Sequence, residues 1–531
     1  MYYKIFKLIN KTKLLTPFNY KYFFIIWIAN LFANIGMWAQ SVASAWIVTT
    51  YHASPFIVAM IQVSTAMPLV IFSIISGVLA DNYDRRNLML ISITIECLVN
   101  ILITIMSFLN CITPYFLLVS ILGVSMGASF TVPAWQSAVN EQVPPSKLSY
   151  AVLLNGVNYN VARAIGPALG GIMINYIGPS YVFLFNFFCY IGIIFSLWQW
   201  RRDINKNNVE PERIFEGIIT ALKFIKHSSV IRYIMIRSFY FSFSASTIFA
   251  LLPLIAHHHN NNVYGYMLGA LGLGAILGSI FVYKLRKLMG VSGLISFSSL
   301  IISLILLTIG YYNNICLLFI IIILIGIFWM AVIASCNSSI HILIPYWIKA
   351  RALALYQTAL YAGIAFGSLL WGRLADIIDI NCTFILSGIL LILISIMLIN
   401  TQLPEFSSNK FCRNDDAYID FYKPSFIFNH ERGGSIIVSI EYQIKDKDIL
   451  EFINTVQLIR KLRLRNGAYI WYIYRDIKKK EIWKEIYLVK NWLQHKRMLD
   501  RLTIYDKLIL NKLINLLNNP PIMKHGVIFN N

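Results

Sequence analysis

Charged residues are scarce in this sequence. Only 13% of its 531 residues are Asp, Glu, Lys or Arg, whereas 58% are hydrophobic and the mean hydropathy is +0.64. A soluble domain of this length would not stay in solution with such a composition. The sequence also lacks a GxxxxGK[ST] segment, which disfavours ATP-driven chemistry by this chain alone, and its seven cysteines show no paired spacing. We therefore expect an integral membrane protein with no metal and no cofactor.

Long apolar runs are abundant. Crossing the roughly 30 Å hydrocarbon layer takes about 20 apolar residues per helix, and twelve runs of sufficient length can be placed. Because backbone groups in the bilayer must satisfy one another, and because the runs lack the alternation of barrel strands, helices are predicted. The runs lie at about 22–48, 55–80, 88–109, 114–138, 149–174, 180–200, 231–256, 264–285, 292–312, 315–343, 350–373 and 381–402.

Basic residues collect on alternate loops. They precede the first run, follow the second at Arg85 and Arg86, and recur in the middle loop from Arg201 to Lys226. The opposite loops, around His52, Cys111, Gly178, Asn260 and Asn313, carry no Lys or Arg. The positive-inside rule then places both termini in the cytoplasm. The net charge of +21 reflects this topology and contact with anionic lipid headgroups, so no nucleic-acid partner is expected.

An internal repeat relates the two halves of the apolar region. Three pairs of sites share one separation of 201 positions: residues 77–86 with 278–287, Gly166 with Gly367, and Gly171 with Gly372. This predicts two six-helix halves in the same orientation, residues 1–200 and 231–403, joined by a cytoplasmic loop at 201–230. Val282 stands in the second copy where the first has Asp81, so only the first half keeps the full charge cluster.

The turn GVLADNYDRR, residues 77–86, resembles the loop between the second and third helices of major facilitator superfamily transporters. Asn82 replaces an Arg of that motif and Asp84 replaces a Gly, whereas the remaining signature positions match: Gly77, Asp81, Arg85 and Arg86. The resemblance implies the twelve-helix major facilitator fold, an all-α polytopic membrane protein. It also implies that this cluster is a cytoplasmic gate that holds the two halves together in one access state.

The fifth run contains NVARAIGPALGG, residues 160–171. This segment resembles the glycine-proline motif that superfamily antiporters carry in helix five, which implies close helix packing that seals the cavity on one side. The matching positions are Arg163, Gly166, Pro167, Gly170 and Gly171. Ordinary helix packing is the alternative interpretation. The arginine-glycine motif of helix four is missing from this sequence, which puts the coupling role usually given to that arginine in doubt.

Three ionisable residues fall deep within the runs, namely Glu96, Arg163 and Arg237. Such groups are costly in a bilayer and tend to face partners or a water-filled cavity. Glu96 is the only acid among them, so it is the candidate for taking up and releasing a proton during transport. The alternative is that Glu96 pairs with an arginine to hold helices together.

Polar residues at helical spacing suggest a substrate cavity. They are Asn30, Asn34 and Ser41 in the first run and Arg237, Tyr240 and Ser244 in the seventh. In the resembled fold, helices one, four, seven and ten line the cavity, which adds Asn337 as a candidate. Interhelical hydrogen bonding is the alternative role for each of these side chains.

A soluble domain, residues 435–531, is expected to follow a linker at 404–434. Its predicted order of strand, helix, strand, strand, helix indicates a small ferredoxin-like α+β unit. The first strand, SIIVSIEYQI, is expected to offer an edge for self-association. The domain resembles antibiotic-biosynthesis monooxygenases at Glu441, Tyr442, Gly467, Ala468, Tyr469, Trp471, Arg475, Asp476, Trp492, His495 and Arg501.

Taken over nearly its whole length, the chain resembles the bacterial branch labelled transmembrane secretion effector, related to enterobactin exporters. Segments 28–46, 355–376 and 489–506 carry this resemblance. It implies proton-driven export of a siderophore- or drug-like small molecule across the inner membrane. Two alternatives stay open: a membrane-tethered enzyme, in which Trp471, Trp492 and His495 would converge in a pocket, and a sensor or scaffold that does not transport.

Overall fold

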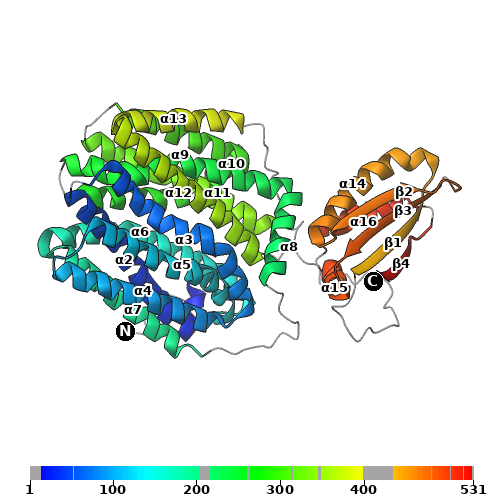
Figure 1. The fold of residues 1–531 in the computed structure, drawn as a ribbon, viewed down its shortest axis with the longest axis horizontal. Coiled ribbons are helices and arrows are strands. Elements are labelled where there is room, and N and C mark those ends of the chain that lie inside the picture. The colour runs from blue at the N-terminus through cyan, green and yellow to red at the C-terminus, as the bar shows by residue number, and fades with distance from the viewer. Residues whose placement is uncertain are drawn as a thin grey trace. The chain divides into compact units, whose positions relative to one another are not determined.

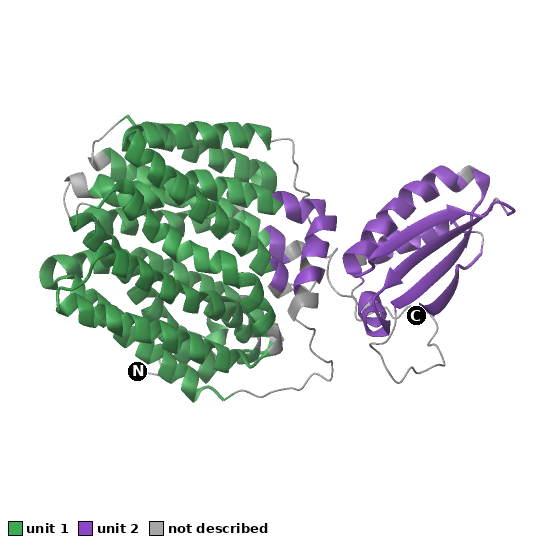
Figure 2. Ribbon diagram, in the orientation of Figure 1, with its two compact units in different colours: residues 1–212, 234–338, 353–403 green, residues 213–233, 339–352, 404–531 purple. Residues whose placement is uncertain are grey.

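The apolar runs fold into long helices that pack into one bundle. The computed structural model describes residues 13–51, 53–201, 214–259, 263–311, 315–344, 349–398, 435–479, 481–500, 502, 504–517 and 519–528. Two compact units divide the chain (Figure 2). Unit 1 comprises residues 1–212, 234–338 and 353–403, and unit 2 comprises residues 213–233, 339–352 and 404–531.

In the first half of unit 1 a short 3-10 helix, Lys13–Asn19, precedes six helices. Two of them begin with the same combination of an N-cap hydroxyl and a proline at the first helical position. Ser54 caps the helix that starts at Pro55, and Thr113 caps the helix that starts at Pro114. The helices are α2 (Lys21–Thr50), α3 (Pro55–Asn82), α4 (Arg85–Phe108), α5 (Pro114–Gln142), α6 (Leu148–Ile177) and α7 (Pro179–Gln199).

The second half repeats the pattern after helix α8 (Ile214–His227) of the middle loop. Its helices are α9 (Ser229–His259), α10 (Val263–Ile309), α11 (Ile315–Leu343), α12 (Lys349–Ile377) and α13 (Ile380–Met397). Helix α10 contains two predicted runs, which meet at Gly290 with φ of 69°, a backbone conformation that favours glycine. In Figure 1 the blue-to-cyan helices of the first half lie beside the green-to-yellow helices of the second.

Eleven helices of the described residues are long and apolar enough to cross a membrane, with α10 counted as two. They coincide with eleven of the twelve predicted runs. The remaining run is α6, which is 30 residues long but does not meet the same hydropathy criterion. Its polar residues include the buried Asn158 and Arg163. Helix α6 packs against α2 and α10 on one face, and apolar side chains such as Leu153 and Ile165 are exposed on the other.

Glycine contacts confirm the internal repeat. A Cβ on Gly166 would lie 2.8 Å from the carbonyl oxygen of Ile35 on α2, and a Cβ on Gly367 would overlap the carbonyl oxygen of Phe243 on α9. The pair Gly171 and Gly372 contacts the opposite half in each case. Gly171 lies against Gly265 of α10, and Gly372 of α12 lies against Ala59 of α3. Equivalent glycines therefore make equivalent helix contacts.

The C-terminal part of unit 2 is an antiparallel sheet covered by helices, in the order β2-β3-β1-β4. Its elements are β1 (Ser435–Gln443), α14 (Ile449–Asn466), β2 (Ile470–Arg475), β3 (Ile482–Val489), α15 (Trp492–Asp500), α16 (Ile504–Asn515) and β4 (Ile522–Ile528). The C-cap of helix α14 is Gly467, which has a positive φ of 132°. Ile436, Val438, Ile440 and Tyr442 point from β1 into the core.

Two expectations for this sheet were wrong. Strand β1 is central rather than an edge, because β3 pairs with one side of it and β4 with the other. Strand β4 was not anticipated, since its sequence follows two prolines and includes Lys524, His525 and Gly526. With β4 present, the edges of the sheet are β2 and β4.

Candidate transport site

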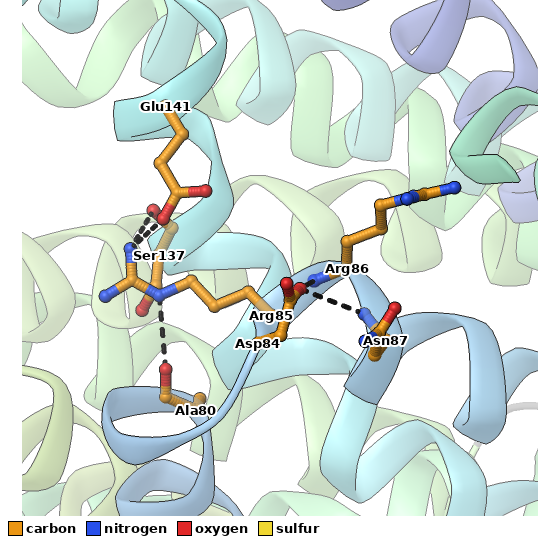
Figure 3. Close-up of polar contacts among 7 residues, drawn as sticks. All are labelled: Ala80, Asp84, Arg85, Arg86, Asn87, Ser137 and Glu141. Carbon is orange, nitrogen blue, oxygen red and sulfur yellow. Dashed lines mark hydrogen bonds and ion pairs between the residues drawn. The ribbon is translucent and has the colours of Figure 1, made fainter. Parts of the chain in front are cut away.

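The turn between α3 and α4 begins α4 with an acidic cap. Asp84 occupies the N-cap position, and its Oδ1 accepts hydrogen bonds from the backbone N–H groups of Arg86 at 2.9 Å and Asn87 at 3.2 Å (Figure 3). A carboxylate at a helix N-terminus also interacts favourably with the helix dipole. The residue that replaces the motif's glycine therefore stabilises the start of α4.

Arg85 connects three helices. Its Nη1 lies 2.7 Å from Oε1 of Glu141 and donates to the carbonyl oxygen of Ser137 at 3.2 Å, both on α5. Its Nε donates to the carbonyl oxygen of Ala80 on α3 at 3.1 Å (Figure 3). Sequence reasoning missed Glu141, because it lies 56 positions from Arg85 and outside the motif. The sequence contained one signal, an acidic residue at the end of the fourth apolar run.

The other members of the motif flank this cluster. Arg86 donates to the carbonyl oxygens of Leu197 at 2.9 Å and Trp198 at 2.6 Å, both on α7. Gly77 is buried in α3, and Asp81 belongs to the last turn of that helix, although its side chain is outside the described part. The basic pair thus joins the ends of α3, α5 and α7 around the start of α4.

The second half has the arginine without the acid. Arg286 donates from Nη1 to Oγ of Ser338 at 2.7 Å, and these residues are the repeat equivalents of Arg85 and Ser137. The position equivalent to Glu141 is Ile342. The repeat therefore preserves the arginine contact between neighbouring helices, whereas the carboxylate partner belongs to the first half only.

Glu96 is buried among α4, α5 and α7. Its exposed fraction is 6%, and its Oε1 accepts a hydrogen bond from Oγ1 of Thr131 at 3.0 Å. The Tyr190 hydroxyl lies within hydrogen-bonding reach of the same carboxyl group. Gly127 makes room for it, since a Cβ there would be 2.5 Å from Cγ of Glu96. Among the described residues, no Lys or Arg forms an ion pair with Glu96.

A buried polar stripe runs along α4 through Glu96. Its members follow one another at intervals of four residues and are all at most 6% exposed: Ser92, Glu96, Asn100 and Thr104. Asn100 donates to Oε1 of Gln40 on α2 at 2.6 Å, and Asn186 on α7 donates to the same oxygen. The Oδ1 atoms of both asparagines find no hydrogen-bond partner within the described ranges. The four-residue spacing was visible in the sequence and could have identified this stripe.

The helix-five motif packs tightly against α2. A Cβ on Gly170 would lie 2.8 Å from the carbonyl oxygen of Ala39, so the two backbones approach without intervening side chains. The guanidinium of Arg163 stands 5.5 Å from the ring centre of Trp38, also on α2. Pro167 is buried, and its carbonyl oxygen lies near Gly265 of α10. The motif thus lies where α6 packs against α2 of the first half and α10 of the second half.

The candidate cavity residues lie in different surroundings. On α2, Asn34 donates to Oδ1 of Asn158 on α6 at 3.1 Å, Ser41 donates to a carbonyl oxygen of its own helix, and Asn30 is half-buried. On α9, Arg237 donates to Ser292 at 2.9 Å and to the carbonyl oxygen of Leu398 at 2.5 Å. The other three range from fully buried to exposed: Ser244, Tyr240 and Asn337.

The C-terminal domain contains a buried charge network centred on Glu485 of β3. Its carboxylate accepts hydrogen bonds from Nε of Arg463 at 3.1 Å, from Nε1 of Trp471 at 2.8 Å, and from the Tyr442 hydroxyl. Burial and the Glu485 charge hold the pKa of Tyr442 well above its usual range. Every strong donor around this carboxylate comes from the domain itself, which suits a structural role.

Two histidines meet beside this network. Nε2 of His495 lies 3.1 Å from Nε2 of His525, with Trp492 packed against both rings. Burial, the neighbouring His525 and Arg463 lower the pKa of His495 to about 3, and burial also lowers the pKa of His525. At neutral pH both imidazoles are therefore uncharged, and one donates its proton to the other.

This pair predicts acid sensitivity of the C-terminal domain. Because the unfolded chain binds a proton near the ordinary histidine pKa and the folded chain does not, the stabilisation is complete above about pH 6.5 and is lost as the pH falls towards 3. The expected slope is about 1.4 kcal/mol per pH unit for one proton. This slope can be measured from the amide hydrogen exchange of β4 and α15 at several pH values, after correction for the intrinsic exchange rate at each pH. Equal protection at pH 7.5 and 5 would contradict the prediction, and His525→Phe should reduce the slope.

Comparison with solved structures identifies the fold. The nucleoside transporter NupG aligns with a TM-score of 0.57 at 12% identity, over 72% of this chain and 99% of that chain. A bacterial homologue of the lysosomal transporter Spinster, inward-facing and unoccupied, aligns at 0.54 and 13% identity, over 71% and 95%. Unit 1 therefore has the fold of a major facilitator superfamily transporter.

The sequence comparison narrows the class to a family. Residues 12–530 match the family model described as transmembrane secretion effector, and the chain belongs to that family. It is 22% identical to the staphyloferrin A transporter of Staphylococcus aureus, over 71% of this chain and 94% of the relative. It is 21% identical to the multidrug efflux pump Tap of Mycolicibacterium fortuitum, over 70% and 94%. The chain is thus a multi-pass membrane transporter.

Proposed function

We propose that this chain exports a siderophore- or drug-like small molecule across the bacterial inner membrane in exchange for protons. The names of its relatives, a staphyloferrin A transporter and a multidrug efflux pump, support these two substrate types. Both termini face the cytoplasm in this proposal, with the basic loops against anionic lipid headgroups. Two six-helix halves, residues 1–200 and 231–403, alternate access around a central site.

The observation that carries the coupling proposal is a difference between the two halves. The repeat equivalents of Glu96, Asn100 and Thr104 are Phe297, Ile301 and Ile305. Phe297 is 37% exposed, whereas Glu96 is 6% exposed, and the ring centre of Phe297 lies 6.0 Å from that of Phe328. The second-half helix keeps buried hydroxyl groups at Ser298, Ser299 and Ser303 but has no acidic residue in this stretch. Because this helix packs in the second half without a carboxyl group, we assign Glu96 to function.

Glu96 is the group in this stripe that can carry a proton. When ionised it accepts from Thr131, and when protonated it can donate to a neighbouring acceptor. A proton that this carboxyl group takes from one side would be held until access changes. Release of that proton on the cytoplasmic side would then accompany outward movement of the substrate.

The Arg85 cluster is the proposed cytoplasmic gate, formed by Gly77, Asp81, Arg85 and Arg86. A gate must make contacts that differ between access states, and side chains that bridge helix ends are suited to this. Helix α6 packs tightly on α2 through Gly166 and Gly170. This packing supports the proposal that the helix-five motif seals one side of the cavity in the access state in which the Arg85 cluster is open.

Arg85→Gln should impair transport more than the equivalent change in the second half. Arg85 makes an ion pair and two carbonyl contacts, whereas Arg286 has a serine hydroxyl as its contact on α11. The ion pair is about one-fifth exposed, so its contribution to stability is at most about 1 kcal/mol, and the expected loss is in transport rate rather than in folding. Initial export rates of Arg85→Gln and Arg286→Gln, at matched expression, would measure the difference. Equal rates would argue against a special role for the first-half cluster.

The C-terminal domain, residues 435–531 after a linker at 404–434, is proposed to act in assembly or regulation. Its sheet has free-standing edge strands at β2 and β4, which are the positions where a second copy could add. The oligomeric size of the full chain in detergent, compared with that of a chain ending at Thr401, would test self-association through this domain.

Export itself can be tested in cells. Expression in an efflux-deficient bacterial host should lower the internal level of staphyloferrin A or of a fluorescent drug such as ethidium, and a protonophore should restore it. The same host expressing an unrelated membrane protein at a matched level provides the control for effects of membrane protein expression. Unchanged accumulation of every siderophore and drug tested would refute the proposed substrate classes.

A further inference from the structure

Helix α8 of the middle loop has a partner within unit 2. It lies in the segment that connects the two six-helix halves, and it packs against α14 of the C-terminal domain. Both elements belong to the purple unit in Figure 2. A loop segment and a domain nearly 240 positions later in the chain therefore form one compact body.

The contact centres on an aromatic ring under an arginine. Phe224 of α8 is 2% exposed, and the guanidinium carbon of Arg465 on α14 stands 5.4 Å from its ring centre. An apolar ring buried this completely on a 14-residue helix needs covering side chains from elsewhere in the protein. Stacking of a guanidinium on an aromatic face is a favourable contact as well as a cover.

Arg465 is held in position from behind. Nη2 of Arg465 lies 2.6 Å from each carboxylate oxygen of Asp506 on α16, and Asp506 is 1% exposed. The carboxylate thus holds one end of the guanidinium in place before it meets Phe224, which lowers the entropy lost on contact. Lys223 of α8 also lies near Lys490, and burial together with this like charge lowers the pKa of Lys223.

Hydrogen bonds also connect the end of α8 to the first turn of α9. Nη1 of Arg232 donates to the carbonyl oxygen of Lys226 at 3.0 Å, and backbone hydrogen bonds continue through Ser228. Because α8 ends at His227 and α9 begins at Ser229, a displacement of α8 would act directly on the start of α9, the first helix of the second half.

We propose that the C-terminal domain docks on α8 within the same chain, through Arg465 on Phe224, and so restrains the loop that joins the two halves of the transporter. The domain is then an intramolecular partner of the transport cycle rather than a passive appendage. Conditions that release the domain would free α8 and the beginning of α9 together. This inference does not depend on which substrate is carried or on proton coupling.

Hydrogen exchange of the full chain, reconstituted as single copies in lipid nanodiscs, tests the docking. Phe224→Ala and Arg465→Lys should each accelerate exchange of residues 214–227 by about tenfold, equivalent to a loss of about 1.4 kcal/mol. Leu222→Ala is the matched control, since this side chain of α8 is 49% exposed, and it should leave exchange unchanged. The double variant should be no faster than either single variant, because both remove one shared contact.

Two further readouts separate docking from damage. In Phe224→Ala the amides of α14 and the sheet should stay protected, because the substitution lies outside the domain. In Arg465→Lys the release of α8 should occur while β1 and β3 remain protected. Wild-type exchange of residues 214–227 in both single variants would overturn the proposal. Additive effects in the double variant would also overturn it, since they would mean that the two residues act independently.

Discussion

Glu96→Gln is expected to abolish proton-driven accumulation while leaving substrate binding intact. Glutamine preserves the shape of the side chain and can still accept the hydrogen bond of Thr131, but it cannot bind and release a proton in the transport range. A gradient of about one pH unit supplies about 1.4 kcal/mol per proton, enough for about tenfold accumulation with one-for-one exchange. In the variant this ratio should fall to about one.

Substrate counterflow distinguishes loss of coupling from loss of the protein. Exchange of labelled for unlabelled substrate across the membrane needs binding and alternating access but no net proton movement, so it should continue in Glu96→Gln. Thr131→Ala is a useful companion, because it removes a hydrogen-bond donor to Glu96 and keeps the carboxyl group. Full gradient-driven accumulation in Glu96→Gln would reduce Glu96 to a structural residue.

Gly170→Ala is expected to reduce transport at least about tenfold and to destabilise the first half by about 1–3 kcal/mol, the usual cost of overpacking. The added Cβ would lie 2.8 Å from the carbonyl oxygen and 2.9 Å from Cα of Ala39, and backbone atoms on α2 cannot move aside cheaply. Export rate and thermal unfolding in detergent would measure the two effects.

The same substitution elsewhere on α6 provides the control. A Cβ on Gly156 has no atom within 4 Å, and alanine has the higher helix propensity, so Gly156→Ala should be neutral or stabilising. If the two alanine variants behaved alike, close packing at Gly170 would not be what the helix-five motif provides.

The sequence predicted those features that depend on local pattern or on repetition. Apolar runs located eleven spans, and the shared separation of Gly166 and Gly171 from their second-half partners anticipated equivalent helix contacts. The apolar runs depend on local composition, and the glycine repeat depends on single residues at a fixed separation. Both can be recognised without knowing which helices are neighbours.

The features that could not be predicted depend on which segments meet in space. Glu141 is the partner of Arg85 because α4 and α5 run side by side, and no motif marks that pairing. Strand β1 looked like an edge until β4, a strand without clear alternation, added to its free side. The sequence identified Glu96 but not Thr131 or Tyr190, which come from two other helices.

The central claim, export driven by protons, is tested most directly in inside-out vesicles containing the purified transporter and an imposed proton gradient. A siderophore or drug that the cellular assay identifies as a substrate should accumulate inside these vesicles, and collapse of the gradient by a protonophore should abolish accumulation. Proton efflux followed with a pH-sensitive dye should begin only when substrate is added. Equal amounts of substrate accumulated with and without the proton gradient would contradict proton-driven export.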